Sequence, residues 1–302
     1  MRVDSATAAL LTLPPLFWAG NAVAARMLVG DVPPVALSLA RWVIAFLLLL
    51  PFAAAAVLRH GDALARHWRI LLLIGPLGVG AYNTLQYIAL QTSTPMATSL
   101  IASSSPVFIL VLGVLVFGER TRAAQWLGAA LSVAGVLLVM ARGDPANLAQ
   151  LRFVPGDLIM LFANLTWTLY TWLLRKHRPD VPFAPLLLVQ IAIGISAIAP
   201  FAVLETAISP ARIAWSANVV AAMVYMAVFP SLLAYWCWDT GIRRVGAVIP
   251  VYFANLTPVF AAVLSAWLLA DSPQPYHVGA LLLIIGGIQL ASRPAPAAPD
   301  RR

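Results

Sequence analysis

Charge is scarce in this sequence. Only 10% of its 302 residues are charged, and 62% are hydrophobic. A soluble globular domain typically carries about 25% charged residues. So few charges cannot cover a surface that faces water, and the mean hydropathy of +0.89 points the same way. The composition therefore excludes an ordinary soluble domain and predicts a protein whose partner is the lipid bilayer.

Cysteine and metal-binding groups are scarce too. The single cysteine, Cys237, cannot form a disulfide within the chain. The four histidines, at positions 60, 67, 177 and 277, have no spacing typical of a metal site. We therefore expect no metal and no cofactor. The formal net charge of +8 would favour nucleic acid as partner of a soluble protein, but membrane proteins collect Lys and Arg in cytoplasmic loops, so none is expected here.

Apolar segments fill most of the chain. Crossing the hydrocarbon core takes about 20 residues in a helix. Ten segments qualify: 6–27, 34–58, 68–91, 95–117, 123–141, 155–174, 182–204, 213–238, 246–270 and 276–292. The long uncharged stretch 70–118 holds two of them, because Pro95 disfavours helix in the residue before it. The pattern predicts an all-α membrane protein with ten transmembrane helices.

Lys and Arg are spread unevenly over the ends of these segments. If the amino terminus is inside, fourteen of the nineteen lie at inside ends, four lie outside at positions 26, 142, 152 and 212, and Arg41 lies within the second segment. Cytoplasmic loops are the basic ones, so we expect both termini in the cytoplasm. Residues 293–302, rich in proline and alanine, are expected to form a disordered cytoplasmic tail.

The two halves of the sequence resemble each other. Residues 18–26 align with 167–175, and 106–108 align with 258–260, where both read Pro-Val-Phe. Residues 1–142 and 150–292 are therefore expected to be two repeats. Each has five helices, an odd number, so the second repeat enters the membrane from the opposite side. Such inverted repeats are typical of secondary transporters, whose site lies near the midplane between the halves.

Short motifs recur in order through both repeats. The first repeat has Trp18-Ala19-Gly20-Asn21, Pro34 with Arg41, Pro106, Gly118-Glu119-Arg120, and Trp126-Leu127-Gly128 with Gly135. The second has Gly156-Asp157, Trp167, Tyr170, Pro258 and Gly279. Together they resemble the EamA group of the drug/metabolite transporter superfamily. Two departures are Ala270-Asp271 in place of Gly118-Glu119, and Gln190 opposite Arg41.

This resemblance implies an exporter of small metabolites with ten helices and a central cavity between the two halves. Within the group, the chain looks most like bacterial exporters of amino acids, including aromatic ones. We therefore expect a multi-pass inner-membrane transporter that exports neutral and aromatic amino acids by alternating access. A monomer is expected.

Polar and aromatic side chains within apolar segments are candidates for the cavity wall, because they are costly in lipid. Tyr82 and Gln86 lie four residues apart and share one helical face. The candidates for substrate binding are Trp18, Asn21, Tyr82, Gln86, Ser103, Asn164, Trp167, Tyr170, Tyr235 and Asn255. Each has a structural alternative, since Ser and Asn often bridge helices and Trp and Tyr often form interfacial belts.

Arg41 lies seven residues into the second segment, roughly 10 Å along a helix. An unpaired arginine is costly there. We expect Arg41 to pair with a helix-end carbonyl or to snorkel outward, with a substrate carboxylate as the alternative partner.

Acidic residues are missing from the centres of the segments. Proton-coupled export of cationic drugs generally needs a membrane carboxylate for which substrate and proton compete. Asp239 and Asp157, near segment ends, are the reserves for a coupling role. The sequence favours a facilitator or a weakly coupled exchanger, with a proton-coupled exporter of cationic drugs as the alternative. A carrier of sugar phosphates or nucleotide sugars fits less well, because phosphates need buried Lys or Arg and Arg41 alone is available.

An intramembrane enzyme is not expected. A rhomboid-like protease needs a serine positioned beside a histidine within the membrane, but all four histidines lie at segment ends. The carboxylate clusters that would hold magnesium in a prenyltransferase are absent from the sequence. We therefore predict no catalytic residue.

Overall fold

Every regular element is a helix in the part of the chain that the computed structural model describes, which comprises residues 3–93, 98, 101–141, 143–149, 154–208, 212–269 and 275–293. The first expected repeat contains α1 (Ser5–Met27), α2 (Pro34–Arg59), α3 (Gly61–Arg66), α4 (Trp68–Ile74), the π-helix η1 (Gly75–Ala81), α5 (Tyr82–Ala89), α7 (Ser105–Leu115) and α8 (Ala123–Met140). The rest of the chain contains α9 (Ala146–Ala149), α10 (Pro155–His177), α11 (Phe183–Ile208), α12 (Ala217–Ala227), the π-helix η2 (Val228–Leu233), α13 (Ala234–Val245), α14 (Val248–Ala254), α15 (Thr257–Leu269) and α16 (Pro275–Ala291).

Five helices are long and apolar enough to cross a membrane: Ser5–Ala25, Pro34–Arg59, Pro155–His177, Phe183–Ile208 and Ala217–Val245. Four shorter apolar helical stretches are Ser105–Leu115, Ala123–Leu138, Val248–Ala261, which includes α14 and the start of α15, and Val278–Ala291. The all-helical fold is thus confirmed for the described residues, and its long apolar helices are consistent with a membrane protein. The total of ten spans and the cytoplasmic termini stay predictions. The expected tail beyond Arg293, and Asp271, lie outside the described residues.

Two expected spans contain a π-helical turn near their middle. The span expected at 68–91 is α4, η1 and α5 in succession, and the eighth is α12, η2 and α13. Each π-helix contains a proline, Pro76 or Pro230, whose missing N–H removes one regular helical hydrogen bond and favours a wider turn.

The predicted bounds of the eighth span, 213–238, are wrong. Its helix ends only at Val245, before Gly246, which has a positive φ of 85° that suits glycine.

The ninth expected span, 246–270, is divided. α14 ends at Ala254 and α15 begins at Thr257, so Asn255 and Leu256 form a break between them. The proline at position 258 sits in the first turn of α15, where its fixed φ and missing N–H are tolerated.

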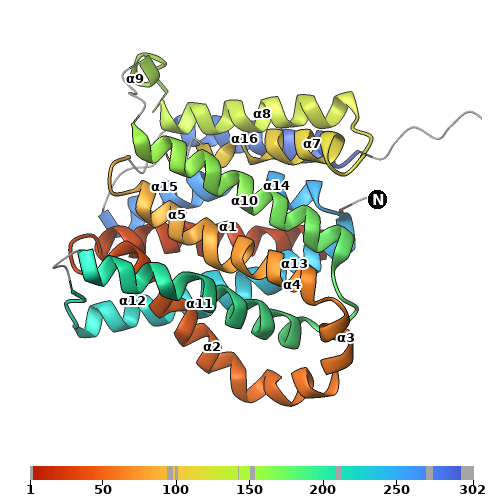
Figure 1. Cartoon of the computed structure of the whole chain (residues 1–302). Coiled ribbons are helices and arrows are strands. Elements are labelled where there is room, and N and C mark those ends of the chain that lie inside the picture. The colour runs from red at the N-terminus through yellow and green to blue at the C-terminus, as the bar shows by residue number, and fades with distance from the viewer. Residues whose placement is uncertain are drawn as a thin grey trace, which may run out of the picture.

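The two expected repeats interlock. α1 packs against η2, α13, α14 and α15 of the second repeat, while α10 packs against α4, η1, α5 and α7 of the first. α8 runs beside α16 along one edge of the molecule, and α2 runs beside α11 along the opposite edge, with α1, α5, α10 and α13 between them (Figure 1). Glu205 on α11 also caps α2, because its carboxylate accepts from the backbone N–H groups of Val35 (3.0 Å) and Ala36 (2.8 Å).

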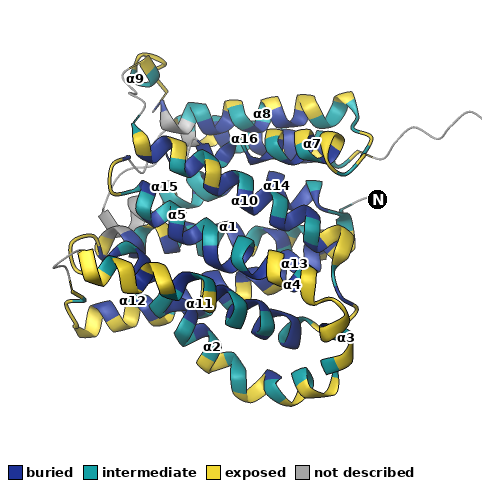
Figure 2. Cartoon of the chain, in the orientation of Figure 1, coloured by how far each residue is buried: buried dark blue, intermediate teal, exposed yellow. Residues whose placement is uncertain are grey.

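Burial is arranged as lipid requires. Large apolar side chains such as Phe52 (82% exposed) and Leu58 cover the outer surface, and the buried positions gather along α1, α10 and α13 in the interior (Figure 2). Arg41, only 1% exposed, lies in that interior with several buried amides and hydroxyls. Apolar groups facing outward and polar groups facing inward are the arrangement of a bilayer protein with a functional interior.

Candidate functional site

A small cavity lies where the interlocked helices of the two halves meet. Its volume is about 90 Å³. The wall is formed by α1, α5, α10, α13, the region around the start of α7, and the break between α14 and α15. Its side chains are Trp18, Asn21, Ala22, Tyr82, Asn83, Gln86, Ala102, Ser103, Ser105, Trp167, Tyr235, Ala254, Asn255, Thr257 and Pro258.

Trp167 on α10 is the centre of the aromatic wall. Its ring centroid lies 5.2–5.5 Å from those of five other aromatic residues: Trp18, Tyr82, Tyr170, Tyr235 and Trp238. The Trp18–Trp167 pair, which the sequence repeat relates, is edge-to-face. Such tilted and T-shaped contacts are favourable between quadrupoles, and they hold the rings in fixed positions. The wall therefore offers a rigid apolar surface to a flat or hydrophobic side chain.

Each π-helix accepts a hydrogen bond from an aromatic side chain of the opposite half. The Tyr235 hydroxyl donates to the backbone carbonyl of Gly78 in η1, and the Trp18 indole N–H lies 3.4 Å from the carbonyl of Pro230 in η2. A π-turn leaves carbonyls without regular helical partners, so they remain available to side chains. These turns therefore fix two rings of the wall across the interface between the halves.

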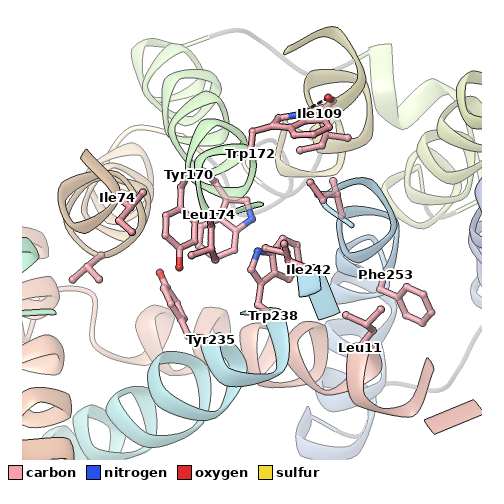
Figure 3. Close-up of a cluster of buried hydrophobic side chains, with 14 of the residues drawn as sticks. Leu11, Ile74, Ile109, Tyr170, Trp172, Leu174, Tyr235, Trp238, Ile242 and Phe253 are labelled. Atoms are coloured by element: carbon pink, nitrogen blue, oxygen red, sulfur yellow. Dashed lines mark hydrogen bonds between the residues drawn. The ribbon is translucent and has the colours of Figure 1, made fainter. Parts of the chain in front are cut away.

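Tyr170 stands behind the cavity wall. Its ring covers Gly78, where an added Cβ would lie 2.5 Å from the ring, so only glycine fits beneath it. The phenol ends of Tyr170 and Tyr235 point toward one another (Figure 3), with the ring centroids 6.1 Å apart. Tyr170 therefore supports Trp167 and Tyr235 from outside the cavity.

Asn164 likewise lies outside the cavity. Its amide oxygen accepts from the Ser105 hydroxyl, and its amide nitrogen donates to the carbonyl of Ile101 at 3.0 Å. Asn164 thus bridges α10 to the start of α7. Asn255 lines the cavity and also donates to Ser132 on α8 at 3.1 Å.

Arg41 forms a buried network beside the cavity. Its guanidinium donates to Ser231 (2.6 and 3.1 Å), to the Tyr87 hydroxyl (2.7 Å), and to the amide oxygens of Asn83 (3.1 Å) and Asn21 (3.3 Å). The expectation that Arg41 snorkels outward or pairs with a helix-end carbonyl is wrong. The side chains of Asn21, Asn83 and Tyr87, together with Ser231 of η2, instead surround the charge in the interior.

No acidic side chain of the described residues pairs with Arg41. The ion pairs in this part of the protein join Lys176 to Glu119 and join Asp239 to Arg178 and Arg243. A buried charge without an opposite charge is costly, and hydrogen bonds to neutral oxygens offset that cost only in part. Because Asn21 and Asn83 also line the cavity, one layer of amides separates the Arg41 guanidinium from its interior.

Asp239 and Asp157 both have partners away from the cavity. Arg178 donates to Asp239 at 2.7 Å, and Arg243 lies 3.2 Å from its other oxygen. Asp157 accepts from the Ser93 hydroxyl and from the backbone N–H of Val154, where it completes the first turn of α10. Neither residue lines the cavity.

The structure thus gathers eight of the ten sequence-based candidates around one cavity, with Tyr170 and Asn164 immediately behind. Three polar lining residues were not among the candidates: Asn83, Ser105 and Thr257. A signal was available for two of them, because Ser105 and Thr257 each precede the proline of the repeated Pro-Val-Phe motif. Asn83 was not predicted because it is adjacent to Tyr82, and adjacent residues on a regular helix face different ways.

Comparison with known proteins gives a consistent result. The model of the EamA-like transporter family matches the chain twice, over residues 6–141 and 154–293. An uncharacterized transporter of Archaeoglobus fulgidus is 26% identical over 293 residues, which is 96% of this chain and 98% of that protein. The aromatic amino acid exporter YddG of Ancylobacter novellus is 26% identical over 71% of this chain and 73% of that protein.

The fold is also known from crystallography. One solved chain superposes with a TM-score of 0.74 at 23% sequence identity, covering 95% of this chain and 96% of that one. At this identity the likeness concerns the fold alone. The family match, by contrast, extends over both halves of the sequence, so the chain belongs to the EamA-like transporter family and is a multi-pass membrane transporter of that type.

Proposed function

We propose that this protein exports neutral amino acids, aromatic ones included, across a bacterial inner membrane. In this proposal the chain spans the membrane ten times as two inverted repeats, with both termini in the cytoplasm, and works as a monomer by alternating access. The substrate binds in the central cavity. Its carboxylate faces Asn21 and Asn83, and its side chain lies against the wall formed by Trp18, Tyr82 and Trp167.

The observation that carries the proposal is the charge of Arg41. The cavity lining contains no carboxylate, and the guanidinium that bonds to two lining amides has no acidic partner among the described residues. Both Asn21 and Asn83 direct their amide oxygens toward Arg41, so the ends that Arg41 does not hold are the amide nitrogens, which are donors. Donor groups with a positive charge behind them favour a carboxylate.

The size of the cavity supports a moving site. Sites for small molecules usually enclose about 300–1,000 Å³. At about 90 Å³ the present cavity is too small for an aromatic amino acid, so the helices must separate for the substrate to enter. The π-turns of η1 and η2 lie next to the wall and contain prolines, which makes them candidates for the bending points.

The alternatives fit the site less well. A cationic drug would meet a positive potential and no carboxylate in the cavity. A sugar phosphate would need several basic groups, and Arg41 is already surrounded by neutral oxygens. A named relative, YddG, is an exporter of aromatic amino acids, which supports the same class of substrate here.

Uptake into proteoliposomes tests the proposal. The panel is labelled phenylalanine, alanine, phenethylamine (phenylalanine without its carboxylate) and ethidium under an imposed pH gradient. We expect saturable movement of the amino acids and little movement of phenethylamine. Proton-driven movement of ethidium without amino-acid movement would contradict the proposal.

Two tryptophan variants link transport to the cavity. Trp18→Ala removes part of the cavity wall, whereas Trp126→Ala removes an indole that is 38% exposed and lies far along the chain on α8. We expect the first to raise the half-saturating concentration of phenylalanine strongly and the second to leave it near the wild-type value. Equal effects of the two variants would argue against a site at Trp18.

A further inference from the structure

A second, separate pocket of about 540 Å³ lies at one end of the helices, between the α3–α4 junction and the end of α10. Its rim is basic. The rim residues are Arg66, His67, Arg69, Lys176, His177 and Arg178. By the uneven distribution of Lys and Arg, this end is expected to face the cytoplasm.

Much of this charge has no acidic partner. Lys176 pairs with Glu119 at 2.5 Å, and Arg178 pairs with Asp239. Neither Arg66 nor Arg69 forms an ion pair with any acid of the described residues, although Asp62 lies one turn before Arg66 on α3. The rim therefore keeps a net positive charge, supplied chiefly by Arg66 and Arg69, and is suited to an anion.

The floor of the same pocket is apolar. Ile70 and Leu73 lie one turn into α4, and Leu173 lies one turn before the end of α10. Trp68 (54% exposed) stands beside the rim, with the Arg69 guanidinium 5.4 Å from its ring centroid, as expected of a tryptophan at a membrane interface. A basic rim above an apolar floor, at the end of membrane-spanning helices, matches a molecule with an anionic head and an apolar body.

We propose that this pocket binds the headgroup of an anionic phospholipid. Arg66 and Arg69 receive the phosphodiester, and Ile70, Leu73 and Leu173 receive the glycerol and the first part of the acyl chains. Basic pockets between transmembrane helices on the cytoplasmic side are a recurrent way of binding such lipids. Because the pocket lies against α10, which carries Trp167 of the central cavity, a bound lipid would brace a helix of the transport site.

Lipid binding to the purified full-length protein tests the proposal. Native mass spectrometry in detergent would be titrated with phosphatidylglycerol, and with phosphatidylcholine as the neutral reference. The test variant is Arg66→Gln/Arg69→Gln. The control, Arg59→Gln/Arg120→Gln, loses the same charge at exposed positions outside the pocket. All four side chains are exposed, so both variants should fold, which a melting curve checks.

We expect phosphatidylglycerol to bind about 30-fold more weakly to the pocket variant, since each basic residue near such a surface contributes about five- to sixfold in affinity. The control should bind it like the wild type, and phosphatidylcholine should not distinguish the three proteins. Equal weakening in both variants would show a diffuse charge effect and overturn the proposal, as would no weakening in either.

A competition arm separates lipid from a soluble anion. Inorganic phosphate and glycerol phosphate carry the charge without acyl chains, so they leave the apolar floor empty. We expect neither to displace phosphatidylglycerol at concentrations similar to that of the lipid. Displacement by either at such concentrations would assign the pocket to soluble phosphates and overturn the lipid assignment.

Discussion

Arg41 carries its charge into the interior of the protein, and its hydrogen-bond partners are neutral oxygens of Asn21, Asn83, Tyr87 and Ser231. If its role is to attract a substrate carboxylate, Arg41→Met should reduce the preference for phenylalanine over phenethylamine by about tenfold. That factor corresponds to the 1–2 kcal/mol expected of two charges separated by one layer of amides. The measurement is the ratio of the half-saturating concentrations of the two compounds in proteoliposomes.

Arg41→Lys is the matched control, because it keeps the charge and loses the fork of donors. It should preserve most of the preference even if transport slows. A purely structural role gives a different outcome. Both variants would then lower the melting temperature and impair the two compounds equally.

The residues of the site show what a sequence can and cannot reveal. Trp18, Tyr82 and Trp167 are recognisable as candidates because large aromatic and polar groups within apolar segments need a reason to be there. The partners of Arg41 are not recognisable in this way. Ser231 reaches it through a π-turn, and no helical periodicity places residue 231 opposite residue 41. Hydrogen-bond partners from distant segments depend on the tertiary fold, which local pattern does not encode.

At the scale of elements, the pairing of α8 with α16 depends on glycine. A Cβ added at Gly287 would lie 2.6 Å from the carbonyl oxygen of Gly128, and one added at Gly128 would lie 2.7 Å from the carbonyl oxygen of Gly287. The adjacent Gly286 has no atom within 4 Å of such a Cβ. We therefore predict that Gly287→Ala lowers the free energy of unfolding by about 1–3 kcal/mol, the usual cost of overpacking, and that Gly286→Ala does not.

Thermal unfolding of the two variants in the same detergent checks this prediction. The pair is well matched, because the two substitutions are chemically identical and adjacent on one helix. Equal melting temperatures for both variants would mean that the helices separate at little cost. Close backbone approach through small residues would then not hold this helix pair together.

The elements themselves were largely predictable, and the exceptions share a cause. Helical segments follow from long apolar runs, and each of the ten expected segments contains helix in its described part. The divided ninth segment and the late end of the eighth were not predicted. In both places a short-range signal exists, Pro258 and Gly246, but only packing against the other half decides whether a helix breaks or continues there. Hydropathy indicates that a segment lies in lipid, but it does not detect a break in the helix within that segment.

At the scale of the whole molecule, the two halves hold each other at several levels. α1 lies among helices of the second half and α10 among helices of the first. Glu205 joins α11 to the start of α2, whereas Lys176 pairs with Glu119 across the halves elsewhere. The two halves are thus linked through contacts at several separate places. This is what alternating access requires, since one side must open while the other stays closed.

The proposed transport needs no coupling to protons if no carboxylate of the cavity exchanges a proton. Asp239 is held by two arginines, and Asp157 is bound to Ser93 and Val154, so neither is placed to compete for substrate. We predict that exchange of labelled for unlabelled phenylalanine proceeds at the same rate with and without an imposed pH gradient. The Arg178→Gln/Asp239→Asn variant removes the buried pair and leaves only Arg243, whose side chain is half exposed and solvated by water, so it should behave in the same way. If a pH gradient drives uphill accumulation in the wild type, and the double variant but not Asp157→Asn abolishes it, Asp239 is a coupling residue and transport is not facilitated diffusion.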